Sequence, residues 1–135
     1  MAPFVHPLRV RYHECDKQGI VFNANWFAYF DITLTELWRA AFGSYEAMVE
    51  RGSDTVVAET TARFRAPAGF DDELEIALAV ERLGTTSMVA GFAVSRDGRA
   101  LVEGRTVYVF VDPATMRKQE IPGWVREGLA PYMAE

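Results

Sequence analysis

Alternating hydrophobic and polar residues predict five strands along the chain. Residues 8–12 place Leu8, Val10 and Tyr12 on one face and two arginines on the other, which is typical of a half-buried strand. Residues 73–82 alternate in the same way over a longer stretch. Turns rich in glycine, proline and aspartate separate these segments from three further predicted strands, at 56–66, 87–95 and 100–111.

Residues 24–42 change to a helical period, with apolar residues recurring every three or four positions. Further aromatic residues widen the apolar stripe well past one face, so the predicted helix is mostly buried. Asn23 or Asn25 is the predicted N-cap of this helix, and Gly43 is its predicted end. Two shorter helices are predicted, at 44–51 and within the tail segment 121–133.

The order of these elements predicts the fold class. Successive strands joined by tight turns, such as the Asp97-Gly98 turn, must be antiparallel. One long buried helix and one antiparallel sheet of about five strands make an α+β fold, in which the sheet curls around the helix. The two edge strands of such a sheet need to be paired or covered, so we expect an oligomer.

Composition narrows the class of protein. A chain of 135 residues is the length of one domain, predicted at 1–135. The formal net charge of −5 argues against a dedicated nucleic-acid binder, and the single cysteine excludes an internal disulfide or a cysteine-rich zinc site. No apolar run approaches the roughly 20 residues that a membrane span needs, so we expect a cytoplasmic protein with no membrane partner.

The segment 10–26, VRYHECDKQGIVFNANW, carries a recognisable motif. A strand leads into an acidic tripeptide ending in aspartate, then two variable residues, Gly-hydrophobic-Val and the start of a helix. This pattern resembles the signature of hotdog-fold acyl-CoA thioesterases of the 4-hydroxybenzoyl-CoA thioesterase type. Weaker matches follow in order along the chain, at Ala66-Pro67, Asp71-Asp72, 84–87 and Asp112-Pro113. The resemblance implies a hotdog fold and hydrolysis of a thioester.

Thioester hydrolysis needs a nucleophile or base and a donor for the oxyanion that forms. The resemblance implies that Asp16 is the nucleophile or general base, and the sequence does not decide between the two roles. It places the backbone N–H of Asn23, at the start of the helix, as the oxyanion donor. Gly19 is expected to let the backbone turn sharply and to let a substrate come close. Some branches of the family have histidine at the position of Asn23, and asparagine cannot act as a general base.

Other acidic and thiol side chains near Asp16 have expected roles of their own. Glu14 is expected to be structural, paired with an arginine, and the alternative is a direct role in the reaction. Cys15 lies between two acids, which raise the pKa of a thiol and argue against a nucleophilic cysteine. The histidines and carboxylates lack the spacing of metal ligands, so we expect no metal and no cofactor.

Four residues are candidates for the acyl-binding pocket. Asp31 lies two helical turns after Asn23, and in the benzoyl-thioesterase branch the matching acid faces the acyl group. The alternative is an aspartate that pairs across a subunit interface. Thr60 and Thr61 are expected on a strand that faces the helix, where they line the pocket or are ordinary strand threonines. Trp26 belongs either to an aromatic pocket or to the core.

The resemblance also implies a site for coenzyme A. Arg117 and Lys118 match the basic surface of the family near the nucleotide, and Thr86 and Ser87 match its polar stretch near the pantetheine. The alternative is that these four are ordinary surface residues. We expect a dimer at least, and a tetramer beyond it, with the active site between two subunits. Two other functions stay open: hydrolysis of an acyl group from acyl carrier protein, and acyl-CoA binding without catalysis.

Overall fold

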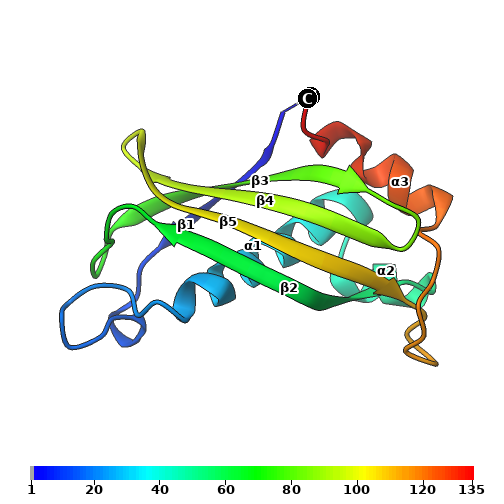
Figure 1. Ribbon diagram of the computed structural model, residues 1–135, viewed down its shortest axis with the longest axis horizontal. Coiled ribbons are helices and arrows are strands. Elements are labelled where there is room, and N and C mark those ends of the chain that lie inside the picture. The colour runs from blue at the N-terminus through cyan, green and yellow to red at the C-terminus, as the bar shows by residue number, and fades with distance from the viewer. Residues whose placement is uncertain (1) are drawn as a thin grey trace.

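The computed structural model describes residues 2–135 and contains one long helix on an antiparallel sheet, as predicted (Figure 1). The elements follow in the order β1 (Phe4–Arg9), the 3₁₀ turn η1 (Tyr12–Glu14), α1 (Asn25–Phe42), α2 (Tyr45–Glu50), β2 (Asp54–Phe64), β3 (Glu73–Leu83), β4 (Ser87–Arg96), β5 (Arg99–Val111), α3 (Gly123–Leu129) and η2 (Ala130–Tyr132). The α+β class and the five strands expected from the sequence are confirmed.

The strands form one sheet in the order β1-β3-β4-β5-β2, with every neighbouring pair antiparallel. β3, β4 and β5 follow one another as hairpins, and β2 lies beside β5 at one edge. The predicted Asp97-Gly98 turn joins β4 to β5, with φ of 51° and 79°. These left-handed conformations are the ones that a two-residue hairpin turn requires. β1 and β2 are left as the edge strands.

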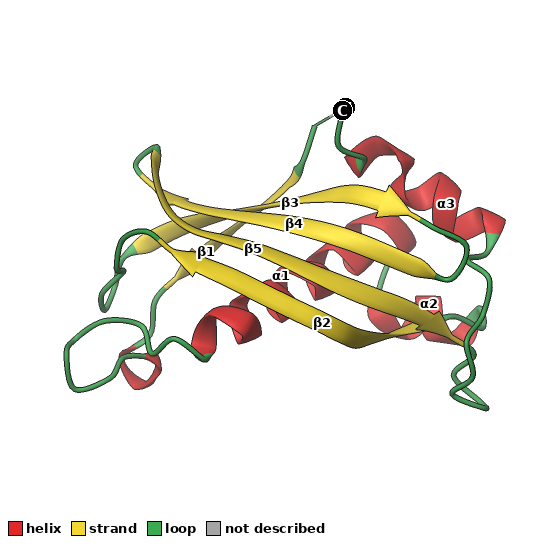
Figure 2. Ribbon diagram, in the orientation of Figure 1, coloured by secondary structure: helices red, strands yellow, loops and turns green. Residues whose placement is uncertain are grey.

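Helix α1 runs along one face of the sheet and fills the core, as Figures 1 and 2 show. Its buried residues pack against the inward face of β3 and β4, and this core contains Trp26, Tyr29, Phe30, Leu34, Leu37, Trp38, Leu74, Ile76, Leu78, Val80, Met88, Ala90, Phe92 and Val94. The helix ends as predicted at Gly43, whose φ is 93° and whose N–H donates to the Arg39 carbonyl at 2.9 Å. The predicted asparagine N-cap is wrong, because Ala24 occupies that position without a side-chain bond.

The first strand also differs from the prediction. β1 ends at Arg9, and Tyr12 lies in η1 with 80% of its surface exposed. Val10 is buried as expected, but its backbone pairs with Asp71 and Asp72 in the loop before β3. The chain then turns away to form the loop that precedes α1. Three alternating apolar residues are too few to mark the end of a strand.

Candidate functional site

Asp16 lies in a tight turn between η1 and α1. Its backbone N–H donates to the Ile20 carbonyl at 2.9 Å, and its own carbonyl accepts from the Gly19 N–H at 2.9 Å. Gly19 has φ of 80°, so the turn needs glycine there for conformational reasons. The Asp16 carboxylate accepts the backbone N–H of Gln18 at 2.8 Å. The turn therefore fixes both the backbone and the carboxylate of Asp16.

The carboxylate of Asp16 and the start of α1 share one cavity of about 390 Å³. Asn23 and Trp26 line it from the helix side, and the end of β2 closes it with residues 64–67. The structure thus brings together three of the predicted site residues. Gly19 is not in the cavity wall. Sequence reasoning missed the contribution of Gln18 and Ile20, and it treated Ala66-Pro67 as a family match without placing it at the site.

The two backbone N–H groups just before α1 are available for hydrogen bonding. Within residues 2–135, the N–H groups of Asn23 and Ala24 donate to no other group, whereas the N–H of Asn25 donates to Phe22. Free N–H groups and the positive end of the helix dipole favour an anion at this position. Asp16 and Asn23, a carboxylate and a residue with an unused N–H donor, therefore border the same cavity.

Glu14 has the structural role expected of it. Its Oε1 accepts from the Arg11 backbone N–H at 2.7 Å and from the Tyr29 hydroxyl at 2.8 Å, and its Oε2 lies 3.5 Å from the Arg11 guanidinium. Burial, followed by the bond to Glu14, raises the pKa of Tyr29, so the hydroxyl remains a donor at neutral pH. This cluster anchors the loop that carries Asp16.

Cys15 is unsuited to nucleophilic attack. Its thiol pKa is raised first by burial and then by the charges of Asp16 and Glu14. The raised thiol pKa agrees with the sequence prediction, although burial contributes more to it than the two neighbouring acids do. Across residues 2–135, His, Cys, Asp and Glu form no group of three or more that could hold a metal ion.

A second depression, of about 400 Å³, lies further along α1 and contains Asp31 and Thr60. Phe27, Phe30, Val57 and Tyr108 are among its other walls. The Thr60 hydroxyl lies 2.9 Å from that of Thr106 on β5, which is buried.

Asp31 is exposed at the mouth of this depression and makes no ion pair within the described residues. Arg39, two turns further along the same helix, pairs instead with Glu36 at 3.2 Å.

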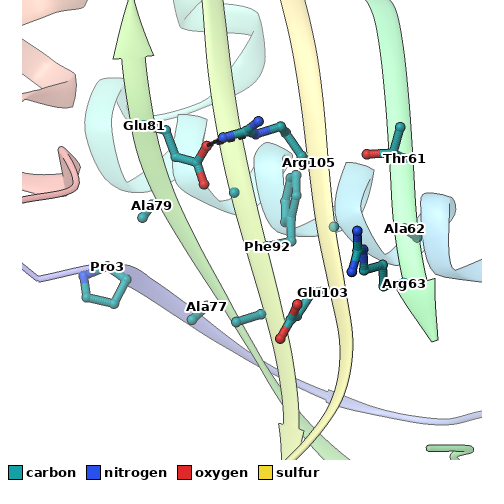
Figure 3. Close-up of a pocket in the computed structure, with 13 residues that line it drawn as sticks. Pro3, Thr61, Ala62, Arg63, Ala77, Ala79, Glu81, Phe92, Glu103 and Arg105 are labelled. Atoms are coloured by element: carbon teal, nitrogen blue, oxygen red, sulfur yellow. Dashed lines mark hydrogen bonds and ion pairs between the residues drawn. The ribbon is translucent and has the colours of Figure 1, made fainter. Parts of the chain in front are cut away.

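Thr61 does not face the helix, so this part of the prediction is wrong. It lies on the opposite face of the sheet, beside Arg63 and Arg105, as Figure 3 shows. Adjacent residues of a strand point to opposite faces, so Thr60 and Thr61 cannot both line one pocket. Only Thr60 remains a candidate for the acyl pocket.

The four candidate coenzyme A residues gather at the end of the sheet away from Asp16. The Phe110 N–H donates to the Thr86 carbonyl at 2.8 Å, and Lys118 bridges to Val111 at the end of β5. Figure 1 shows the loop after β5 and the β3–β4 turn at one end, and the loop before α1 at the other. Arg117 and Lys118 are exposed and make no ion pair with any described residue. Within one chain, these residues do not reach the Asp16 cavity.

Comparison with known proteins decides the family. A family model described as the Thioesterase superfamily matches residues 18–103, which is more than half of the chain and includes the helix start and most of the sheet. This chain belongs to the thioesterase superfamily. The predicted class of enzyme, a thioester hydrolase, is thereby confirmed.

Two relatives cover nearly all of this thioesterase. It is 32% identical over 120 residues to the Escherichia coli protein "Acyl-CoA thioester hydrolase YbgC", covering 88% of this chain and 90% of the relative. The crystal structure of a hypothetical protein from Aquifex aeolicus has a TM-score of 0.89 at 28% identity, covering 94% of this chain and 99% of that one.

A 1,4-dihydroxy-2-naphthoyl-CoA thioesterase from Synechocystis shares the fold of this thioesterase, with a TM-score of 0.84 at 15% identity, covering 94% and 95% of the two chains. The hotdog fold predicted from the motif is thus confirmed. Among the described residues, no helix of this thioesterase is both long and apolar enough to cross a bilayer.

Proposed function

We propose that this thioesterase hydrolyses acyl-CoA thioesters, with Asp16 as the nucleophile or general base. The observation that carries the proposal is the shared cavity, which is bordered by the Asp16 carboxylate and by Asn23 at the start of α1. The similarity to a relative described as an acyl-CoA thioester hydrolase supports coenzyme A as the carrier. No cofactor is needed, because water and a carboxylate supply the chemistry.

The thioester carbonyl would lie between Asp16 and the free N–H of Asn23, just before α1. In one route, Asp16 attacks the carbonyl carbon, the thiolate of coenzyme A leaves and takes up a proton, and water hydrolyses the mixed anhydride. In the other route, Asp16 accepts a proton from the water that attacks. In both routes negative charge develops on the carbonyl oxygen, where the Asn23 N–H would donate to it.

The acyl group would extend from this cavity along α1 toward the second depression. Trp26 lies in the wall of the first, and Asp31 and Thr60 in that of the second. A carboxylate and a hydroxyl at the far end suit an acyl group that carries a hydroxyl. A purely aliphatic group would form no hydrogen bond with Asp31.

We propose a dimer formed across the free edge of β2. β1, the other edge strand, contains Pro7, which removes one N–H from its backbone, whereas β2 has 11 residues and no proline. Val56 and Val57 expose apolar surface along the β2 edge. A two-fold axis there would pair the two β2 strands antiparallel and continue the sheet into the second subunit. A tetramer of two such dimers remains a prediction.

This dimer would complete the active site. Asp16 lies near the Phe64 end of β2, and Lys118 lies near its Asp54 end, beside Val111. Antiparallel pairing places the start of one β2 beside the end of the other. Arg117 and Lys118 of the partner subunit would then approach the Asp16 cavity and bind the phosphates of coenzyme A, with Thr86 and Ser87 at the same end.

The substrate is tested with a panel of thioesters. Wild-type protein is assayed for thiol release from short aliphatic, long aliphatic, benzoyl and hydroxybenzoyl esters of coenzyme A, and from the same acyl groups on acyl carrier protein. The proposal expects turnover on coenzyme A esters. Turnover restricted to acyl carrier protein would identify the other carrier, to which the exposed Arg117 and Lys118 are also suited. Tight binding without turnover would contradict the hydrolase and favour a binding module.

The shared site is tested by mixing two inactive variants. Asp16→Asn subunits are co-expressed with subunits that carry Arg117→Ala and Lys118→Ala. If the basic residues act on the partner's Asp16, each mixed dimer contains one site with both wild-type groups, and about half of the wild-type rate per dimer returns. If they act within their own subunit, both sites stay defective and no rate returns.

A further inference from the structure

Glu14 ties the loop that carries Asp16 to the interior of α1. Its carboxylate accepts the Tyr29 hydroxyl at 2.8 Å. Tyr29 is fully buried in the second turn of α1, with its ring edge-to-face against Trp26 at 5.3 Å. A buried ring held on two sides cannot move independently of the helix. The hydrogen bond therefore connects the loop to a rigid part of the core.

The backbone of the same residue closes the loop. The Glu14 carbonyl accepts the Phe22 N–H at 3.0 Å and the Asn25 side-chain amide at 2.8 Å. The Glu14 carbonyl thus binds Phe22, which follows the Asp16 turn, and Asn25, the first residue of α1. The Glu14 carboxylate binds Tyr29, in the second turn of that helix. Asp16 follows two positions later, in the loop that these hydrogen bonds of Glu14 close.

We infer that Glu14 and Tyr29 are positioning residues, whose hydrogen bond holds the Asp16 carboxylate in place against the start of α1. Neither residue lines the Asp16 cavity, so neither would touch the substrate. The inference rests on the proposed function, because it assigns them to the step that Asp16 carries out. A displacement of the order of 1 Å in such a group lowers turnover by roughly 100-fold.

The direct test is Tyr29→Phe, which removes the hydroxyl and keeps the ring in the core. We expect kcat to fall by about 10-fold or more, with KM within about twofold of wild type, because the change acts on the reacting geometry and not on substrate binding. In the Asp16→Asn background the same substitution should cause no further loss, since the group that it positions is absent.

Thr33→Val is the matched control. Thr33 lies one turn further along α1 and is also fully buried, and its hydroxyl donates to the Tyr29 carbonyl at 2.9 Å. The variant loses a buried hydroxyl of the same helix without touching Glu14. Its melting temperature should fall by an amount similar to that in Tyr29→Phe, while kcat stays at the wild-type value. An equal loss of kcat in Tyr29→Phe and Thr33→Val would mean that the Tyr29 hydroxyl only stabilises the fold, and would overturn the inference.

Hydrogen exchange supplies a readout that does not depend on turnover. The backbone amides of Asp16 and Phe22 are both hydrogen-bonded within the loop. Their exchange should accelerate about 10-fold in Tyr29→Phe and stay unchanged in Thr33→Val, because only the first variant releases the loop. Unchanged loop exchange in Tyr29→Phe would overturn the inference whatever the activity. A wild-type protein that hydrolyses no thioester would instead contradict the proposed function.

Discussion

Replacing Gly19 by alanine separates the geometry of the Asp16 turn from the stability of the fold. Gly19 has φ of 80°, and an added Cβ would meet no other atom within 4 Å. The cost is therefore the left-handed backbone conformation alone, about 1–2 kcal/mol for an L-residue. For a chain of this length, 1 kcal/mol lowers the melting temperature by roughly 4 °C.

Gly98→Ala is the control for that substitution. Gly98 has φ of 79°, and a Cβ there also meets nothing within 4 Å. The two variants should therefore lose the same stability in thermal unfolding. Only Gly19 donates its N–H to the Asp16 carbonyl, at 2.9 Å. We expect steady-state turnover to fall at least about 10-fold in Gly19→Ala, because the turn shifts the carboxylate, and to stay at the wild-type value in Gly98→Ala.

An intact kcat in a destabilised Gly19→Ala protein would refute this reasoning. It would mean that the carboxylate of Asp16 keeps its place when the turn is altered, or that Asp16 does not act in the reaction. Equal losses of turnover in both glycine variants would point to general destabilisation at the assay temperature. The assay is therefore run well below the lower of the two melting temperatures.

Three further substitutions test other parts of the account. The pKa of Asp72 is lowered by the backbone N–H of Gly69 and by Arg96, so Asp72→Asn should lower the free energy of unfolding by about 1 kcal/mol at pH 7. Measured by urea unfolding, this difference from wild type should disappear as the pH falls below 3.8, the ordinary pKa of the aspartate side chain. Gly104→Ala places a methyl group against the Phe30 ring and should cost about 1–3 kcal/mol in thermal unfolding, and an unchanged melting temperature would contradict this packing. Asp31→Asn should lower kcat/KM for a hydroxybenzoyl ester about 10-fold relative to the benzoyl ester, whereas equal effects on both would exclude recognition of the hydroxyl.

The long elements could be predicted because their patterns are regular. The 24–42 helix is apolar around most of its circumference, and α1 occupies 25–42. β3 alternates between exposed or half-buried and buried residues from Glu73 to Val80, and Leu74, Ile76, Leu78 and Val80 are all buried. The end of β1 was missed because the chain leaves the sheet after Arg9 to pair with the loop before β3, and that contact is not encoded in local alternation.

The loop that carries Asp16 was predicted as a candidate site from the motif, and the residues that it contacts were not. Asp16, Gly19 and Asn23 lie within eight positions of one another, so a local pattern can identify them. The cavity wall from residues 64–67 lies far along the chain from the segment between Asp16 and Trp26, and no local pattern reports such a contact. The prediction that Thr61 faces the helix is wrong because adjacent residues of a strand point to opposite faces, and Thr60 takes the inward position.

Hydrolysis of the preferred coenzyme A ester by Asp16→Asn protein tests the central claim most directly. Asp97→Asn is the control, because it removes the same charge from an exposed hairpin turn, where φ is 51° and asparagine is well tolerated. The account predicts that kcat falls by about 100-fold or more in Asp16→Asn, with the fold intact, and stays at the wild-type value in the control. Full turnover by Asp16→Asn would contradict it and move the chemistry to another group in the cavity.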